Sequence, residues 1–399
     1  MDVYLVGGAV RDALLGLPVS DRDWVVVGGT AEVLLSQGYQ PVGQDFPVYL
    51  HPDTHEEYAL ARTERKSGQG YKGFTVSAVP TTTLEEDLMR RDLTVNAIAQ
   101  DSAGQLIDPY GGIADLNNRL LRHISAAFAE DPLRVLRVAR FAARFHHLGF
   151  RIAPETVDLM TQMTDEGALQ YLVAERVWQE TWRALSEPSP WVYLETLRAC
   201  GALAILMPEW DSSWRSPLEY DPNRSVSDHL TRALAHQVAH EPSADIGFAL
   251  MCHGARLSAP CANDPTTAVA QTAQLCERLK APNKTKSLAL LCTRWMRSCH
   301  QIKDTPADEI LALITQLGAL KADEQLLAFI ACCWSDFAAQ HHQAPYPMGD
   351  WLTACVARCR AIGSAPFIEQ GLRGPAIGQH MADARIEAIA QEQATWQAH

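Results

Sequence analysis

The chain opens with a short apolar strand, a glycine turn and two aspartates one residue apart, and this arrangement constrains its N-terminal fold more than any other feature. The strand and turn read Leu5-Val6-Gly7-Gly8-Ala9-Val10-Arg11-Asp12, and the acids are Asp21 and Asp23. Alternate side chains of an extended strand point to one face, so the two carboxylates are expected side by side, while Arg22 and Trp24 point away. Like charges this close repel unless a cation lies between them.

An acidic pair beside a glycine turn is typical of phosphoryl transfer. Mg²⁺ prefers hard oxygen ligands, commonly one or two carboxylates together with substrate phosphates. Gly7-Gly8 lets the backbone approach a phosphate, and a helix beginning there would aim its N–H groups at an anion. A glycine pair alone is also common at an ordinary strand–helix junction. Arg11 and the two acids at this spacing favour a metal-assisted phosphate site instead.

Charge and composition narrow the class of protein. The 399 residues suffice for more than one domain, and the formal net charge of −13 argues against an indiscriminate nucleic-acid binder. We see no apolar run long enough for a membrane span and no secretory signal. The ten cysteines all lie at or beyond Cys200, and they contain no CxxC pair. A cytoplasmic protein with reduced thiols, no membrane partner and no DNA partner is expected.

The secondary-structure pattern predicts an α+β chain. Strands are expected over Val3–Val6, Trp24–Val27, Gln40–Leu50 and Glu57–Arg62. A capping box at Thr83-Leu84-Glu85-Glu86 predicts a helix that runs to about Ala99. After Asp131-Pro132 the pattern is helical to the end of the chain. We therefore expect a small mixed-sheet head at 1–120 and an elongated all-α remainder, divided into a neck at 121–190, a body at 191–270 and a tail at 271–399.

A second motif reads Arg90-Arg91-Asp92-Leu93-Thr94-Val95-Asn96. Asp92 and Asn96 are four residues apart and would share one face of the predicted helix. A carboxylate and an amide together suit sugar hydroxyls, while Arg91 suits a triphosphate. The alternative is a helix surface with an ordinary ion pair.

A third motif begins at Glu130-Asp131-Pro132 and continues as an arginine stripe. At 100° per residue, one side of the helix carries Arg134, Arg137, Arg140 and Arg144, and the other side is apolar. Asp131 and Arg134 offer an acceptor and a planar donor one turn apart, which could read the edge of a base. The alternative makes Asp131 a simple N-cap and the arginines a solvated face.

Together these segments resemble the bacterial tRNA nucleotidyltransferases, the class II CCA-adding enzymes, in the superfamily that also holds bacterial poly(A) polymerases. The resemblance rests on the glycine turn with Asp21-Arg22-Asp23, on Arg90-Arg91-Asp92 with Asn96, on Asp108-Pro109-Tyr110-Gly111-Gly112, and on Glu130-Asp131-Pro132-Leu133-Arg134. It is dense over the first 150 residues and looser beyond them.

The resemblance implies a role for each matching position. Asp21 and Asp23 would hold catalytic Mg²⁺ ions, and Gly8 and Arg11 would contact the nucleotide phosphates. The incoming nucleotide would be bound by Arg91, Arg137 and Arg140, its ribose by Asp92 and Asn96, and its base by Asp131 and Arg134. Two further segments would move: a loop at 62–73 that lets the pocket change from CTP to ATP, and a hinge at 108–112.

One segment departs from the family pattern. Some relatives carry a metal-dependent phosphohydrolase domain of His–Asp type, and the corresponding stretch here reads Leu250-Met251-Cys252-His253-Gly254-Ala255-Arg256, with glycine where a metal-binding aspartate would be. Loss of a hard anionic ligand should abolish a divalent metal site, so no phosphohydrolase activity is expected. His253 is then expected in the core.

The resemblance implies template-independent addition and repair of the 3′-terminal CCA of tRNA from CTP and ATP, with release of pyrophosphate. The partners would be ATP, CTP and the acceptor arm and 3′ end of tRNA, which the helical part would hold. A poly(A) polymerase and an enzyme that adds only A remain alternatives. A non-catalytic RNA-binding protein is disfavoured, because such a protein has no need of two mutually repelling carboxylates.

Overall fold

The computed structural model describes residues 1–42, 48–66, 74–257, 265–341 and 345–397. The chain divides into two compact units, one comprising Met1–Pro188 with Val192–Leu206 and the other Ser189–Trp191 with Met207–His399. The first unit therefore contains both the predicted head and most of the predicted neck. The finer division at 120, 190 and 270 stays a prediction.

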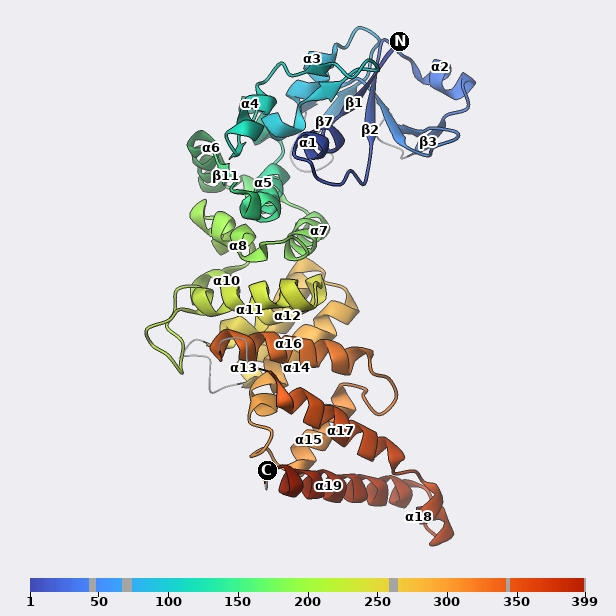
Figure 1. Cartoon of the computed structure of the whole chain (residues 1–399), viewed down its shortest axis with the longest axis vertical. Coiled ribbons are helices and arrows are strands. Elements are labelled where there is room, and N and C mark those ends of the chain that lie inside the picture. The colour runs from blue at the N-terminus through green and yellow to red at the C-terminus, as the bar shows by residue number, and fades with distance from the viewer. Residues whose placement is uncertain (43–47, 67–73, 258–264, 342–344, 398–399) are drawn as a thin grey trace. The chain divides into compact units, whose positions relative to one another are not determined.

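The head is built on a mixed β-sheet (Figure 1). Within the described residues seven strands follow one another in the order β3-β4-β5-β2-β1-β8-β9. Only β2 and β5 run parallel, and all other neighbouring strands are antiparallel. The strands are β1 (Asp2–Val6), β2 (Asp23–Val27), β3 (Gln40–Val42), β4 (Val48–Leu50), β5 (Glu57–Leu60), β8 (Ala99–Gln100) and β9 (Leu106–Ile107).

Both faces of this sheet are covered, which explains its short β-branched strands. On one face Val6 and Val25 pack with Leu84 and Leu88 of helix α3. On the other face Val26 and Leu60, with their neighbours, pack against Leu34 of helix α2. The helices of the head are α1 (Gly8–Leu14), α2 (Ala31–Ser36), α3 (Leu84–Met89) and α4 (Gly112–Asn117). A separate hairpin pairs β6 (Thr63–Lys66) with β7 (Phe74–Ser77), while residues 67–73 of the predicted loop lie outside the described residues.

The strands predicted at Val3–Val6 and Trp24–Val27 are confirmed to within one residue. The single strand predicted over Gln40–Leu50 is wrong, because β3 and β4 are two strands that pair antiparallel, and the strand predicted over Glu57–Arg62 ends at Leu60. The long helix predicted after Thr83 is wrong in its second half. The capping box forms as predicted, but α3 ends at Met89. The next residues form a 3₁₀ turn at Thr94–Asn96 and then the strand β8. Asp92 explains the break, because its side chain accepts a hydrogen bond from the Leu93 N–H at 2.9 Å and so competes with helix formation.

The neck is helical and is anchored by an Asp–Pro start. Asp131 accepts a hydrogen bond from the Leu133 N–H at 3.0 Å, and helix α5 begins at Leu133, as the Asp–Pro signal predicts to within one residue. The exception to the helical pattern is a two-residue parallel pair of β10 (Leu120–Leu121) and β11 (Arg151–Ile152). The helices are α5 (Leu133–Phe145), α6 (Pro154–Asp165), α7 (Ala174–Leu185), α8 (Pro190–Ala199) and α9 (Ala202–Leu206).

The second unit is all-helical over its described residues. Helix α12 packs on α14, and α11 packs on α16, to give a bundle, while α19 packs on α15 and α17. Its cysteines that the structure describes are buried, free thiols, as expected for core residues. The helices are α10 (Pro208–Ser213), α11 (Val226–His240), α12 (Ala244–Gly254), α13 (Pro265–Leu279), α14 (Asn283–His300), α15 (Ala307–Gln316), α16 (Glu324–Gln340), α17 (Pro347–Ala361), α18 (Ala365–Glu369) and α19 (Pro375–Gln397).

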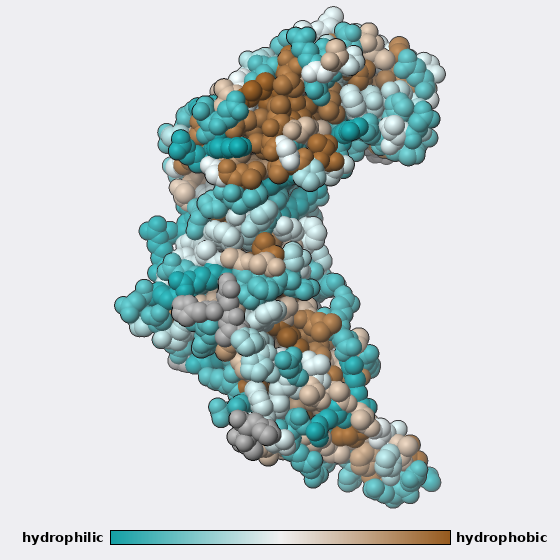
Figure 2. Space-filling view, in the orientation of Figure 1, coloured by the Kyte–Doolittle hydropathy of each residue, from teal (hydrophilic) through white to brown (hydrophobic). Residues whose placement is uncertain are grey.

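The surface mixes apolar and hydrophilic side chains. In the face shown in Figure 2, the largest gathering of apolar residues lies on the head, and hydrophilic residues dominate the adjoining helical part. Among the described residues, no helix combines the length and the apolar character needed to cross a bilayer.

Candidate active site

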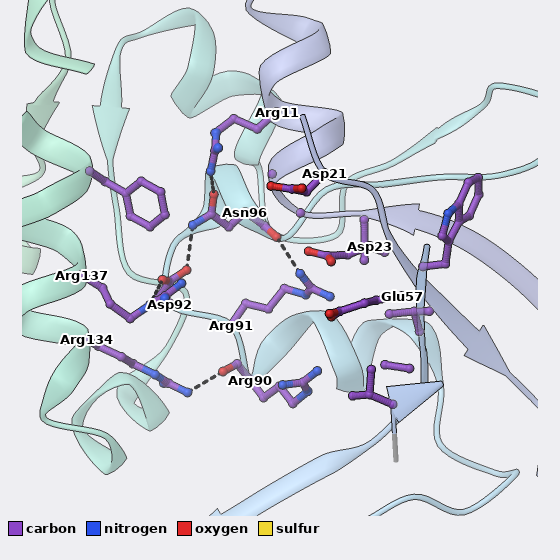
Figure 3. Close-up of a pocket in the computed structure, with 18 of the residues that line it drawn as sticks. Arg11, Asp21, Asp23, Glu57, Arg90, Arg91, Asp92, Asn96, Arg134 and Arg137 are labelled. Atoms are coloured by element: carbon purple, nitrogen blue, oxygen red, sulfur yellow. Dashed lines mark hydrogen bonds and ion pairs between the residues drawn. The ribbon is translucent and has the colours of Figure 1, made fainter. Parts of the chain in front are cut away.

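One pocket of about 580 Å³ collects every site residue that the sequence predicts. It lies entirely within the first unit, between one end of the central strands β1, β2 and β5, the turn after α3, and helices α5 and α7. Figure 3 shows the acids Asp21, Asp23 and Glu57 on one side of it and Arg134 and Arg137 on the other. The predicted residues that line the pocket are Gly8, Arg11, Asp21, Asp23, Arg91, Asp92, Asn96, Asp131, Arg134, Arg137 and Arg140.

The acidic pair forms as predicted, except that only Asp23 belongs to a strand. Asp23 is the first residue of β2, and Asp21 precedes it in irregular backbone. Arg22 is outside the pocket lining and pairs with Glu56 at 3.7 Å. The Trp24 indole N–H donates to the same carboxylate at 2.9 Å, but Trp24 also lines the pocket, contrary to the expectation that it points away. Both acids face the pocket.

The sequence analysis missed a third carboxylate beside this pair. The parallel pairing of β2 with β5 sets Glu57 opposite Asp23 in the register. Neighbouring residues at the same register position point to the same face of a sheet, so Glu57 lines the pocket next to Asp23 (Figure 3). The sequence alone does not identify Glu57, because its place beside Asp23 depends on the pairing of β2 with β5.

The electrostatics around Asp23 suit a bound cation. Partial enclosure by the protein raises the pKa of Asp23 above its ordinary value, Arg91 acts to lower it, and Asp21 raises it further. Asp23 keeps substantial solvent access, so water moderates this shift. A carboxylate whose pKa is raised by enclosure and by a neighbouring carboxylate fits the site of a divalent cation, whose charge would favour its ionised form.

The glycine turn is needed for close packing. Gly7 adopts φ +70°, a conformation that side chains disfavour, and a Cβ placed on it would lie 2.7 Å from a guanidinium nitrogen of Arg91. The Arg91 guanidinium in turn pairs with Asp87 at 3.4 Å and lies beside Asp23 and Glu57 (Figure 3). The turn thus leaves room for the Arg91 guanidinium beside Asp23 and Glu57.

Asp92 and Asn96 meet, although not on the helix that the sequence predicts. The Asn96 side-chain amide donates to Asp92 at 2.8 Å, and the Arg137 Nε donates to the other oxygen of the same carboxylate at 2.8 Å. Burial alone would raise the pKa of Asp92, but Arg137, Asn96 and Arg134 outweigh it and hold that pKa far below its ordinary value. Asp92 is therefore a permanently charged acceptor at the wall of the pocket.

Arg11 is buried and hydrogen-bonded within the protein, unlike an exposed arginine that is free to bind a phosphate. It is 3% exposed, its Nε donates to Asp12 at 2.8 Å, and its NH1 donates to the Asn96 side chain. The guanidinium also lies 5.2 Å from the ring centre of Phe141 and 5.0 Å from that of Phe145, within cation–π range. Arg11 therefore links the glycine turn to helix α5, and its predicted phosphate contact stays a prediction.

The arginine stripe of α5 lines the pocket rather than forming a solvated face. Arg134 and Arg140 are buried, and Arg137 and Arg144 are half-buried. Each is oriented by acceptors from another segment. Arg134 donates to the backbone carbonyls of Ala127 at 2.8 Å and Arg90 at 2.5 Å. Arg140 donates to the Glu180 carboxylate at 2.7 Å. Arg144 donates to the Asp12 carboxylate at 2.9 Å. The acceptors Glu180 and Asp12 are positioning residues that the sequence analysis did not identify.

The second unit contains a separate polar cluster, centred on Asp336. His229 and His300 hydrogen-bond to its two oxygens at 2.8 Å and 3.0 Å, and His253 lies 3.7 Å away. His253 is buried, as predicted. At Gly254 a Cβ would lie 2.6 Å from the Leu230 side chain, so an aspartate there would have to displace it. In the part of the chain that the structure describes, no group of three or more His, Cys, Asp or Glu side chains is arranged to hold a metal ion, and the absence of phosphohydrolase activity stays a prediction.

Comparisons with known proteins agree with the geometry of the first unit. A model of the poly A polymerase head domain matches residues 3–122, and a model described as the probable RNA and SrmB-binding site of polymerase A matches residues 149–213. The multifunctional CCA protein of Thioalkalivibrio sulfidiphilus is 48% identical over 407 residues, covering 99% of this chain and all of that protein. The chain belongs to the CCA protein family.

Solved structures of CCA-adding enzymes share the fold of this family member. That of the Bacillus stearothermophilus enzyme in complex with CTP superposes with a TM-score of 0.65 at 24% identity, covering 98% of this chain and 89% of that one. The Thermotoga maritima enzyme complexed with tRNA_CCA gives 0.64 at 21% identity, covering 99% and 91%. A complex with ATP gives 0.67 at 20% identity, covering 98% and 88%. The predicted α+β class is confirmed, and members of such a nucleotidyltransferase family typically use a divalent metal ion.

Proposed function

We propose that this chain adds and repairs the 3′-terminal CCA of tRNA, using CTP and ATP without a nucleic-acid template and releasing pyrophosphate. The observation that carries the proposal is the single pocket in which an acidic pair, a glycine turn and an arginine stripe meet. Family membership supports the substrate class. An enzyme acting on tRNA would work in the cytoplasm, and the helical body and tail would hold the acceptor arm through shape and phosphate contacts.

In this proposal Asp21 and Asp23 would hold Mg²⁺. The metal would lower the barrier by making the attacking 3′-hydroxyl more nucleophilic and by neutralising charge on the phosphates. The glycine turn would admit the triphosphate, and Gly8, Arg11 and Arg91 would neutralise its oxygens. Because the protein contributes no covalent chemistry, positioning and charge stabilisation would supply the acceleration.

Nucleotide selection would rest on the neck. Cytosine and adenine each present an amino group next to a ring nitrogen that accepts a hydrogen bond, whereas uracil and guanine present a carbonyl oxygen next to a ring N–H. A carboxylate at Asp131 and a guanidinium at Arg134 complement the first pattern and oppose the second. Asp92 and Asn96 would meet the ribose, and Arg137 and Arg140 would hold the nucleotide.

An incorporation assay tests the proposal against its nearest alternatives. We expect tRNA lacking CCA to receive two CMP residues and then one AMP, when Mg²⁺ and labelled CTP and ATP are supplied. The family model named for poly A polymerase makes unlimited AMP addition the second candidate, and addition of AMP only to tRNA ending in CC would identify an A-adding enzyme. No incorporation together with intact tRNA binding would contradict all three activities.

We expect Glu57→Gln to lower the rate of CMP incorporation by roughly 10- to 100-fold without loss of tRNA affinity. The substitution keeps the shape of the side chain but removes a negative charge next to Asp23, where it would help to hold Mg²⁺ or accept the proton of the 3′-hydroxyl. Glu56→Gln is the matched control, since Glu56 faces Trp24 and Arg22 instead of the pocket. Equal rates for the two variants would remove Glu57 from the active site.

A further inference from the structure

The aromatic ring of Phe141 lies among the arginines of the pocket. Phe141 belongs to helix α5, is 5% exposed and lines the pocket. Three guanidinium groups lie over its ring, with the Cζ atoms of Arg11, Arg137 and Arg140 at 5.2, 5.7 and 4.7 Å from the ring centre. All three distances are within the range in which a cation is attracted to the negative face of an aromatic ring.

A second ring extends this arrangement. Phe145, one turn further along α5, lies parallel to Phe141 with the ring centres 6.1 Å apart. The Cζ atoms of Arg11 and Arg144 are 5.0 and 5.3 Å from the centre of the Phe145 ring. The glycine turn, through Arg11, and the arginine stripe therefore rest on the same pair of aromatic rings.

The ring gives these arginines something that their ion pairs do not. Each guanidinium over Phe141 also pairs with a carboxylate, which is that of Asp12 for Arg11, Asp92 for Arg137 and Glu180 for Arg140. An ion pair occupies N–H donors of the guanidinium, whereas stacking on a ring face occupies none of them. The ring therefore restrains the plane of each guanidinium and leaves the remaining donors to a ligand.

We propose that Phe141 is a positioning residue for nucleotide binding: its ring face holds the guanidinium groups of Arg11, Arg137 and Arg140 in the planes from which they donate to the incoming nucleotide. This inference rests on the proposed nucleotide-binding role of these arginines. Donors that are already fixed lose less conformational entropy when a ligand binds, so weakening the ring contact weakens the complex. Because the phosphates and the ribose are common to CTP and ATP, Phe141 acts on the affinity for both nucleotides.

The test replaces Phe141 by singly, doubly and triply fluorinated phenylalanine. Fluorine draws electron density from the ring face but changes the size and apolar character of the side chain little, so the attraction for cations weakens while the packing is kept. We expect the dissociation constant of CTP, and the KM for CTP in CMP addition, to rise with each fluorine to roughly tenfold for the triply fluorinated form. ATP should show the same trend, and the affinity for tRNA should stay at the wild-type value.

Phe150 provides the matched control. It is 4% exposed, and its ring centre lies 5.4 Å from the Cζ atom of Arg119, but neither residue lines the pocket. The same fluorinated series at Phe150 should leave the dissociation constant of CTP and the KM unchanged. Phe141→Leu, which removes the aromatic face altogether, should raise both quantities at least as much as the triply fluorinated form, with thermal unfolding as the check that each variant folds.

The outcomes separate this inference from the proposed function. A CTP affinity that stays constant across the fluorinated Phe141 series, or one that changes equally in the Phe150 series, would overturn the inference even if the wild type adds CCA. A wild type that incorporates neither CMP nor AMP would contradict the proposed function. In that case the trend in CTP affinity still decides whether the ring supports nucleotide binding.

Discussion

Asp21→Ala and Asp23→Ala are each expected to lower CMP and AMP incorporation by roughly a thousandfold or more, which corresponds to about 4 kcal/mol of transition-state stabilisation. Each substitution removes one carboxylate of the acidic pair, and a divalent cation that lost this ligand would be neither tightly held nor correctly placed. Affinity for tRNA should change little, because neither acid belongs to the helical surfaces proposed to hold it. Rapid-quench incorporation and filter binding measure the two quantities separately.

A further variant of the acidic pair, Asp23→Asn, carries a prediction for stability. The pKa of Asp23 is raised in the folded protein, so the ionised form at neutral pH destabilises the metal-free fold, and this destabilisation disappears as the pH falls through the raised value. Asp23→Asn should therefore not lower the Tm of the metal-free protein, and Mg²⁺ should raise the Tm of the wild type but not that of the variant. A large fall in Tm for Asp23→Asn would show that the acid is structural, and Glu56→Gln again provides the control.

Asp336→Ala is expected to destabilise the second unit by about 3–5 kcal/mol. Asp336 is 1% exposed, and its loss would leave the buried His229 and the partly buried His300 without the acceptor that both share. Burial acts to raise the pKa of Asp336, but the three histidines outweigh it and hold that pKa well below its ordinary value. Hydrogen exchange at α14 and α16, the helices of His300 and Asp336, would measure the loss in this unit alone.

A control and a pH series sharpen this second prediction. Asp323→Ala removes an exposed ion pair with Arg360 at the start of the same helix and should cost about 1 kcal/mol or less.

Burial lowers the pKa of His253 to about 4, so the folded state binds fewer protons than the unfolded state between that value and about 6.5. The stability of the second unit should therefore fall as the pH drops through this range. The depressed pKa of Asp336 adds a further loss only below about pH 4, where unfolded aspartate becomes protonated. Unchanged protection at α14 and α16 between pH 7 and 4 would contradict this account.

Local patterns in the sequence predicted much of the first unit. The acidic pair, the glycine turn and the arginine stripe depend on spacings within a single strand or helix, where residue periodicity fixes the direction of side chains. The contact of Asp92 with Asn96 was predicted for the wrong reason, since the side chain of Asp92 ends the helix that was supposed to align them.

The features that the sequence did not reveal depend on distant parts of the chain. Glu57 joins the acids only through the pairing of β2 with β5, and Glu180 reaches Arg140 of the stripe from α7. His229 and Asp336 are separated by 107 positions, and no spacing in the sequence links them. Such partners are set by how helices and strands pack, and a pattern read from one segment cannot supply them.

The single acceptor shared by Asn96 and Arg137 has a consequence for the docking of a sugar in the pocket. Both side chains donate to Asp92, and Asn96 in turn accepts from Arg11 beside the glycine turn. One oxygen of Asp92 accepts from Asn96 and the Leu93 N–H, and the other accepts from Arg137, which leaves an acceptor position beside Arg137. A ribose hydroxyl docked at that position would share an oxygen with Arg137, so sugar and arginine stripe would meet on one carboxylate that Asn96 ties back to Arg11.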